Sequence, residues 1–152
     1  YGSKEVNAFA MANGTIRVYQ GLMDKFTDDE VRFVIGHEIG HVKLGHSLKA
    51  MRTAYATSAV RKGVASQGGA AAQLSGSQLG VLGEKLINSQ FSQSQETESD
   101  TYAVKFMKKH GFDPRAGLSV MKKFQQMDGG KHSMLSSHPA SKDREDHIKS
   151  LL

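Results

Sequence analysis

The sequence of 152 residues contains no cysteine and no tryptophan, and only two prolines. Without cysteine, neither a disulfide framework nor a thiolate metal site can form, so a bound metal would have to be held by histidine, aspartate, glutamate and water. No apolar run approaches the roughly 20 residues with which a helix crosses a bilayer. With 38% hydrophobic and 23% charged residues, the composition predicts one globular domain over residues 1–152.

A strong charge of one sign is also missing. The 20 lysines and arginines exceed the 15 aspartates and glutamates by a formal net charge of +5. A solvated lysine-rich face accounts for this bias, and a basic surface for nucleic acid or anionic membranes is the alternative. Because no aromatic-interleaved basic strand and no recognition-helix motif accompanies the charge, we expect no nucleic-acid partner.

What the sequence does contain is the stretch His37-Glu38-Ile39-Gly40-His41. On a helix, His37 and His41 lie one turn apart on the same face and can bind one metal ion. Glu38 lies about a quarter-turn away, so its carboxylate can reach a water on that metal without being a ligand. Two histidines at this spacing can also be ordinary packed or solvated side chains. The intervening glutamate favours the layout of a zinc hydrolase.

The helix that carries this motif has a recognisable start and an apolar face. Thr27 and Glu30 form a capping box. Apolar residues then recur at intervals of three and four, which predicts a core helix: Val31, Val34, Ile35, Ile39 and Val42. We expect this helix to continue through Leu48, Met51 and Tyr55.

Gly36 and Gly40 each cost about 1 kcal/mol of helix stability relative to alanine. Either a neighbouring backbone, such as a strand, approaches this face closely, or a well-packed helix simply tolerates the glycines. On a continuous helix, His46 lies about 140° from His41 and about 180° from His37. This position predicts that His46 is a surface or second-layer residue and not a ligand.

A small antiparallel β element precedes the helix. Asn13-Gly14 between two apolar runs predicts a hairpin. An exposed strand can add an extended peptide through main-chain hydrogen bonds, which makes Gly14, Ile16 and Val18 candidate substrate contacts. The sequence as a whole therefore predicts a predominantly helical α+β fold.

Residues 63–95 are rich in glycine, alanine, serine and glutamine. This composition is compatible with a disordered linker. The helical spacing of Leu79, Leu82 and Leu86 favours a pair of mobile helices or a flap. A mobile segment between metal-binding elements is where a lid is expected.

A catalytic zinc site needs one more protein ligand besides the two histidines. Glu96 and Asp100 lie one turn apart on a helix predicted from about Ser94 to Lys109. One of them could bind the metal while the other accepts a hydrogen bond from a ligating imidazole. Glu98 points about 160° away from Asp100. Alone, these carboxylates would indicate a solvated acidic helix start, and the histidine motif reverses that preference.

Further motifs occur in a characteristic order along the chain: Asn7-Ala8-Phe9, Asn13-Gly14-Thr15-Ile16, Gly21-Leu22, the histidine motif, Ser92 with Glu96 and Asp100 to Ala103, Gly111-Phe112-Asp113-Pro114, and His138-Pro139 with Arg144. This order resembles the HtpX and CAAX-prenyl-endopeptidase family of zinc metallopeptidases, which are of the gluzincin type. The resemblance covers nearly the whole chain and is strongest to the soluble, periplasmic, LoiP-type lipoprotein branch.

The resemblance implies a zincin-like metallopeptidase domain with the small β element next to the active-site helix. It implies one Zn²⁺ per chain, bound by His37, His41 and Glu96, and it implies that Glu38 is the general base. Asp100 would then support a ligand histidine.

Two residues near the C-terminus also match the family. His138 is placed to assist the developing oxyanion, and the alternative is a capping or packing histidine beside Pro139. Arg144 is expected to shape the site, with substrate contact as the weaker option.

The resemblance further implies an endopeptidase acting on unfolded or misfolded envelope proteins in the periplasm, attached to the membrane by a lipid anchor outside this chain. Since Tyr1 is not an initiator methionine, we expect the numbering to begin inside a longer precursor. The alternative, from a different class, is a catalytically silent zincin-fold chaperone or interaction module. Zinc content does not distinguish the endopeptidase from the silent module. Metal-dependent cutting of a protein substrate, abolished by Glu38→Gln, does distinguish them.

Overall fold

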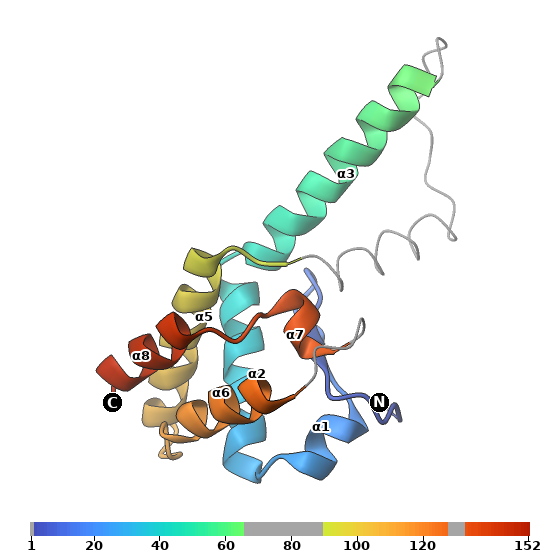
Figure 1. Cartoon of the computed structure of the whole chain (residues 1–152). Helices are drawn as coiled ribbons and strands as arrows, with labels where there is room; N and C mark the ends of the chain where they lie inside the picture. Colours follow the sequence, from blue (N-terminus) through green and yellow to red (C-terminus); the bar gives the residue numbers. More distant parts are fainter. Residues whose placement is uncertain (1, 66–89, 128–132) are drawn as a thin grey trace.

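The computed structural model describes residues 2–65, 90–127 and 133–152 and shows a mainly helical α+β fold (Figure 1). Its elements follow in this order: β1 (Ala8–Ala10), β2 (Ile16–Val18), α1 (Gln20–Lys25), α2 (Asp28–Lys43), α3 (His46–Ala65), α5 (Gln93–Lys109), α6 (Ala116–Gln126), α7 (Met134–Ser137) and α8 (Lys142–Ser150). The predicted fold class is confirmed. α3 projects away from the rest of the molecule (Figure 1).

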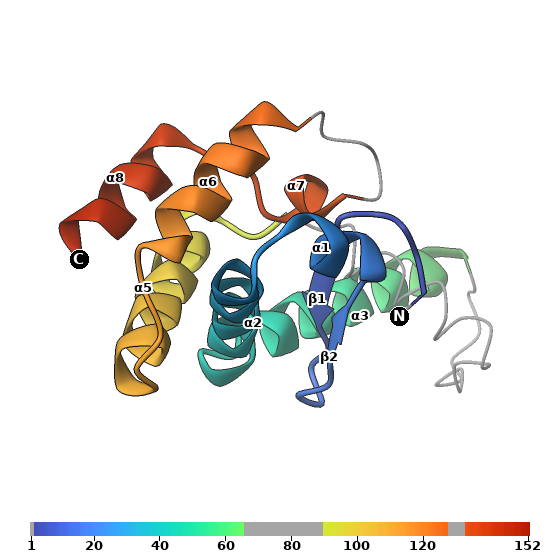
Figure 2. The ribbon, with the colours of Figure 1, turned by 90° about the horizontal axis from the view of Figure 1, so that it is seen from below.

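The helix α2 lies at the centre of the fold. It packs against α5 on one side and against the β hairpin on the other, while α6 contacts α2 and α8 contacts both α5 and α6 (Figure 2). The predicted capping box starts the helix: the Thr27 hydroxyl accepts from the Glu30 N–H, and the Glu30 carboxylate accepts from the Thr27 N–H at 2.7 Å. The histidine motif therefore lies on a central helix whose N-terminus is capped.

Gly36 and Gly40 allow α5 to approach α2 closely. A Cβ atom on Gly36 would lie 3.3 Å from the Cα of Ala103, and one on Gly40 would lie 3.1 Å from the Cα of Ser99. Close approach by a neighbouring backbone is therefore confirmed, although the neighbour is a helix and not a strand. This contact brings the acidic side chains of α5 next to the histidines of α2.

The predicted continuation of this helix through Tyr55 is wrong, because the helix is interrupted before α3 begins. The helix α2 ends at Lys43 with Leu44 as its C-cap, and Gly45 follows with φ of +75°. Glycine adopts this left-handed conformation without steric cost, and a helix commonly ends there. A new helix then begins at His46 and leaves in a different direction (Figure 1).

The hairpin predicted at Asn13-Gly14 is present. β1 and β2 pair in antiparallel register, with Ala8 opposite Val18 and Ala10 opposite Ile16. Both strands contact α2, so the sheet lies beside the motif helix as predicted.

The hydrophobic core lies among the hairpin, α2, α5 and α6, with Ile148 of α8 completing it. It consists of these buried side chains: Val6, Ala8, Leu22, Phe26, Phe33, Val34, Ala103, Val104, Met107, Val120, Met121, Phe124, Met134 and Ile148. The predicted end of the α5 helix at about Lys109 is confirmed, and Gly111 follows it at φ of +73°. The Ser141 hydroxyl caps α8.

In the described part of the chain, no helix is both long enough and apolar enough to span a bilayer. The predicted flap at residues 63–95 has its central part, residues 66–89, outside the described residues. Its ends belong to α3 and α5, and the flap itself stays a prediction.

The packing of α6 on α2 gives a test of the core. A Cβ atom on Gly117 would lie 2.5 Å from the ring of Phe33, whose side chain is 1% exposed. Overpacking costs typically about 1–3 kcal/mol, which exceeds the gain of about 1 kcal/mol from replacing a helical glycine. We expect Gly117→Ala to lower the free energy of unfolding in a urea titration. Gly2→Ala, where the added Cβ meets no atom within 4 Å, is the control; an equally stable Gly117→Ala would contradict this packing.

Candidate metal centre

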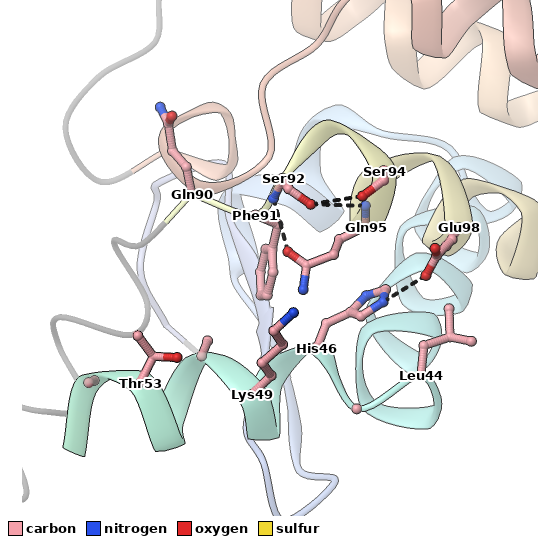
Figure 3. A pocket seen from close by; sticks show the side chains of 13 residues that line it. Leu44, His46, Lys49, Thr53, Gln90, Phe91, Ser92, Ser94, Gln95 and Glu98 are labelled. Atoms are coloured by element: carbon pink, nitrogen blue, oxygen red, sulfur yellow. Dashed lines mark hydrogen bonds and ion pairs between the residues drawn. The ribbon is translucent and has the colours of Figure 1, made fainter. Parts of the chain in front are cut away.

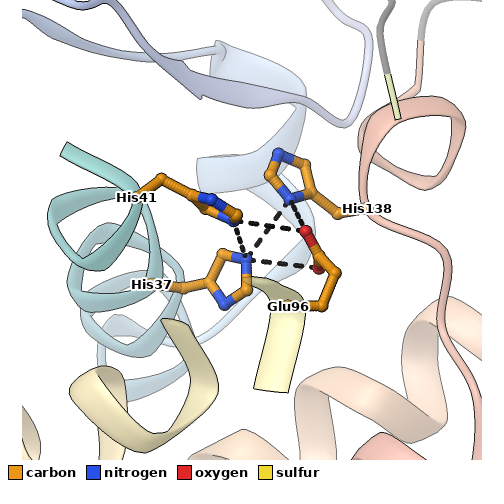
Figure 4. A group of neighbouring side chains, drawn as sticks. All are labelled: His37, His41, Glu96 and His138. Atoms are coloured by element: carbon orange, nitrogen blue, oxygen red, sulfur yellow. Dashed lines mark hydrogen bonds and ion pairs between the residues drawn. The ribbon is translucent and has the colours of Figure 1, made fainter. Parts of the chain in front are cut away.

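Four side chains from three helical elements point at one another in the interior. His37 and His41 come from α2, Glu96 from α5, and His138 from the C-cap of α7 (Figure 4). One donor atom from each lies within 4.8 Å of the other three. All four residues are at most 2% exposed. The structure thus brings the three predicted ligands together and adds a fourth donor.

The distances between these donor atoms suit a tetrahedral metal ion. Zinc bonds of 2.0–2.1 Å to nitrogen and oxygen place the ligand atoms about 3.3 Å apart. The Nε2 atom of His41 lies 3.0 Å from Nε2 of His37 and 3.2 Å from Oε1 of Glu96. The Nδ1 atom of His138 lies 3.3 Å from Nε2 of His37 and 2.9 Å from Oε1 of Glu96. The residues therefore fit one small divalent cation.

Glu38 lies beside the donor group without belonging to it. The residue is 1% exposed, and its Oε1 atom, 3.4 Å from Nε2 of His138, accepts no hydrogen bond from the residues that the structure describes. The backbone N–H of Ala10 in β1 donates to the carboxylate. Burial raises the pKa of Glu38 above its usual value, although the nearby histidines oppose this shift. A buried carboxylate with a free oxygen and a raised pKa is suited to accept a proton from water.

The side chains of Asp100 and Arg144 hold the ring of His37 in place. Its Nδ1 donates to Oδ1 of Asp100 at 2.9 Å, and the guanidinium of Arg144 donates to both Asp100 oxygens at 2.8 Å. Burial opposes ionisation of Asp100, but the hydrogen bonds from Arg144 and His37 keep its pKa below the usual value. Arg144 also lies 2.7 Å from Oε2 of Glu96 and donates to the carbonyl of Pro139. Arg144 is 3% exposed, and its role in shaping the site stays a prediction.

The two histidines of the motif differ in proton affinity. Burial opposes protonation of both rings. At His37 the negative charges of Glu96 and Asp100 outweigh burial and raise the pKa to about 9. At His41 burial dominates and lowers the pKa to about 2. A metal that binds here must therefore displace a proton from His37 but none from His41.

The remaining sequence-predicted residues fall into two groups. Gly14, Ile16 and Val18 belong to the turn and to β2, whereas the strand that contacts Glu38 is β1. Their contact with a substrate stays a prediction. His138 was expected outside the ligand set, but its Nδ1 atom lies among the donors. Its assistance to an oxyanion also stays a prediction.

One side chain that covers the site was missed. The ring of Phe91 stacks on His41 with centroids 4.0 Å apart and lies 5.2 Å from the ring of His138. The backbone N–H of Phe91 donates to the carbonyl of Ser137 at 3.2 Å, which anchors the segment before α5 beside α7. The sequence offered only an isolated aromatic residue in a polar stretch. That signal does not identify a contact with a histidine 50 positions earlier.

His46 lies outside the donor group, in a second layer, as predicted. It was expected at the surface or in a second layer, and the structure places it in a second layer at 5% exposure, in direct contact with His41. The angle of 140° does not apply, because Gly45 breaks the helix between the two histidines. The glycine itself was the available signal for that break.

Known proteins resemble this chain over almost its entire length. The model of the family "Peptidase family M48" matches residues 1–152. Metalloprotease LoiP of Escherichia coli K12 is 53% identical over 98% of this chain and 60% of its own length, and metalloprotease YcaL of the same organism is 44% identical over 98% and 59%. The β-barrel assembly-enhancing protease of that organism is 29% identical over 92% of this chain and 31% of its own length. The chain thus spans about 60% of the first two relatives.

The protonation of His37 gives a pH dependence for metal binding. Below its pKa of about 9 the ring is protonated in the metal-free protein, so binding releases one proton. The apparent Kd for Zn²⁺ is expected to fall about tenfold per pH unit from pH 6.5 towards 9, and then to level off. Competition with a chromophoric chelator, corrected for buffer binding, measures this slope. An affinity independent of pH in this range would contradict the protonation of His37.

The ligand assignment on α5 is tested by a matched pair of variants. Glu96 lies inside the donor group, whereas the side chain of Glu98 is 57% exposed and outside it. We expect Glu96→Ala to lose stoichiometric zinc after dialysis, and Glu98→Ala to retain one zinc per chain, as measured by atomic emission. The opposite ranking would overturn the assignment of Glu96.

Proposed function

The chain belongs to peptidase family M48, and from that premise we propose that it is a zinc-dependent endopeptidase in which Glu38 is the general base. The observation that carries this proposal is the buried donor group of His37, His41 and Glu96, spaced as zinc ligands are, with an unpartnered oxygen of Glu38 beside it. Side chains arranged for metal binding alone would not require that buried carboxylate.

The residues of this chain divide the chemistry among them. When bound, zinc lowers the pKa of a coordinated water towards about 7 and polarises a scissile carbonyl. Glu38 accepts the proton of the attacking water and delivers it to the leaving amine. Asp100 holds the proton of His37 on Nδ1, which leaves Nε2 free to bind the metal. The product is a hydrolysed peptide bond.

His138 is proposed to support the developing oxyanion, where one donor contributes about 2–4 kcal/mol. In the structure its Nδ1 atom lies 2.9 Å from Oε1 of Glu96, among the side-chain atoms that would hold the metal. Phe91 also covers His41. We infer that this arrangement is a closed one, and that both side chains must move before a peptide can reach Glu38.

The proposed substrates are unfolded or misfolded envelope proteins. An extended peptide that pairs with a strand is bound through its backbone, which selects for unfolded chains and reads little sequence. The hairpin supports this proposal because β1 contacts Glu38 directly. A periplasmic location, with a lipid anchor outside this chain, is proposed from the family resemblance.

The alternative function is a catalytically silent metal-binding module that acts as a chaperone or interaction partner. The observation that favours it is the complete burial of the donor group, in which four protein side chains can satisfy a metal without water. Activity measurements separate it from the endopeptidase.

Glu38→Gln keeps the size of the side chain but removes the basic oxygen. We expect the zinc-loaded variant to cut an unfolded substrate such as β-casein at least about 100-fold more slowly than the wild type, the order of a general base, while still binding one zinc per chain. Chelator should abolish wild-type cutting and added zinc should restore it.

Glu5→Gln, an equivalent change at an exposed position, is the control and should leave the rate unchanged. Gel electrophoresis and mass spectrometry of the fragments provide the measurement. The absence of metal-dependent cutting in the wild type, including a form without residues 66–89, would favour the silent module.

A further inference from the structure

A second chain of hydrogen bonds runs outward from the donor group, from the ring of His41. The Nδ1 atom of His41 lies 3.1 Å from the Nδ1 atom of His46. On the other side of the His46 ring, Nε2 lies 3.0 Å from Oε2 of Glu98. The hydroxyl of Ser99 also lies near this ring, 3.4 Å from its Nδ1. Three side chains from α2, α3 and α5 are thereby connected in series.

Metal binding at His41 sets the direction of these hydrogen bonds. If Nε2 of His41 binds the metal, the proton of the neutral ring is on Nδ1. His46 must then accept at Nδ1, which leaves its own proton on Nε2. That proton is directed at the carboxylate of Glu98. Each contact has one donor and one acceptor, so a single set of tautomers satisfies the whole series.

We propose that His46 and Glu98 are positioning residues that orient His41 for the metal. The proposal rests on the proposed metal site and extends it to a second outer layer. His46 accepts from Nδ1 of His41 and so fixes both the ring orientation and the tautomer that presents Nε2 to the ion. Glu98 holds the tautomer of His46 in turn. Neither residue contacts the metal.

The two ligand histidines of α2 are therefore held in different ways. His37 donates to Asp100, whose side chain is fully buried and clamped by Arg144. His41 contacts the imidazole of His46, and the carboxylate of Glu98 on the far side of that ring belongs to a side chain that is 57% exposed. The groups that hold His37, Asp100 and Arg144, are buried away from water, whereas the hydrogen-bonded series that holds His41 ends at the exposed carboxylate of Glu98.

The break at Gly45 makes this arrangement possible. Because α3 starts at His46, the side chain of its first residue turns back towards α2 and α5. His46 and Glu98 line a surface pocket together with Lys49, Gln90 and other residues, and Figure 3 shows the His46 ring directed at Glu98. Solvent can therefore reach the outer end of the series, but not the His41 ring, which is 0% exposed.

The test measures zinc affinity and protein stability separately. His46→Phe keeps an aromatic ring but removes the acceptor, and we expect the Kd for Zn²⁺ to rise about 10–100-fold, the usual effect of losing such a partner. His46→Asn, which retains an acceptor oxygen near the position of Nδ1, should recover most of that affinity. Glu98→Leu should lower the zinc affinity only a few-fold, because water can replace an exposed carboxylate. Glu98→Gln, which still accepts a hydrogen bond, should lower the zinc affinity even less.

Two controls separate positioning from packing. Thermal unfolding in the presence of chelator reports the stability of the metal-free fold, and a purely structural role would lower this Tm without changing the Kd. Since Glu98 is largely exposed, its variants should fold even if His46→Phe does not. His110→Phe, the same change at an exposed histidine of the chain, should leave the zinc affinity unchanged.

A spectroscopic signature tests the tautomer directly. In ¹⁵N spectra of zinc-loaded wild type, the Nδ1–H of His41 should exchange slowly with water, and in His46→Phe this protection should be lost. Unchanged zinc affinity in both His46→Phe and Glu98→Leu would overturn the positioning role while leaving the metal site intact. A wild type that binds no stoichiometric zinc would instead overturn the proposed function, and this inference with it.

Discussion

The close packing of α5 on α2 is the constraint on which the rest of the structure depends. Gly36 and Gly40 present no side chain to α5, so the two backbones approach until a Cβ at Gly40 would lie 3.1 Å from Ser99. Only at this separation does Glu96, one turn into α5, reach the histidines of α2. The two glycines lower the stability of the central helix by about 1 kcal/mol each, and in return they permit this close contact between α2 and α5.

Burial of so much charge is stable only because the charges compensate one another. An ionised carboxylate in a protein interior is costly unless it is paired and hydrogen-bonded. Here Arg144 bridges Asp100 and Glu96, and His37 lies between the same two carboxylates. Glu38 lacks an equivalent strong partner, which is why its pKa is raised while theirs are lowered. The same interior thus holds two carboxylates with lowered pKa values, Asp100 and Glu96, and one with a raised pKa, Glu38.

Much of the local structure could be read from the sequence, because local rules decide it. The capping box at Thr27, the hairpin at Gly14 and the helix end before Gly111 depend on residues within a few positions of one another. The pairing of His37 with His41 is of the same kind, since one helical turn places both rings on one face. The predicted continuation of α2 into α3 is wrong because Gly45, at φ of +75°, ends the helix although the apolar periodicity continues beyond it.

The sequence by itself determined that His37 and His41 share one helix face beside Glu38, and that Glu96 and Asp100 lie one turn apart on a later helix, because helical periodicity is encoded in neighbouring residues. Only the tertiary structure decided that His138 lies among the donors, that Phe91 covers them and that His46 supports His41. These contacts join positions separated by a helix break or by many residues, and spacing along a chain carries no information about distance once the chain has turned.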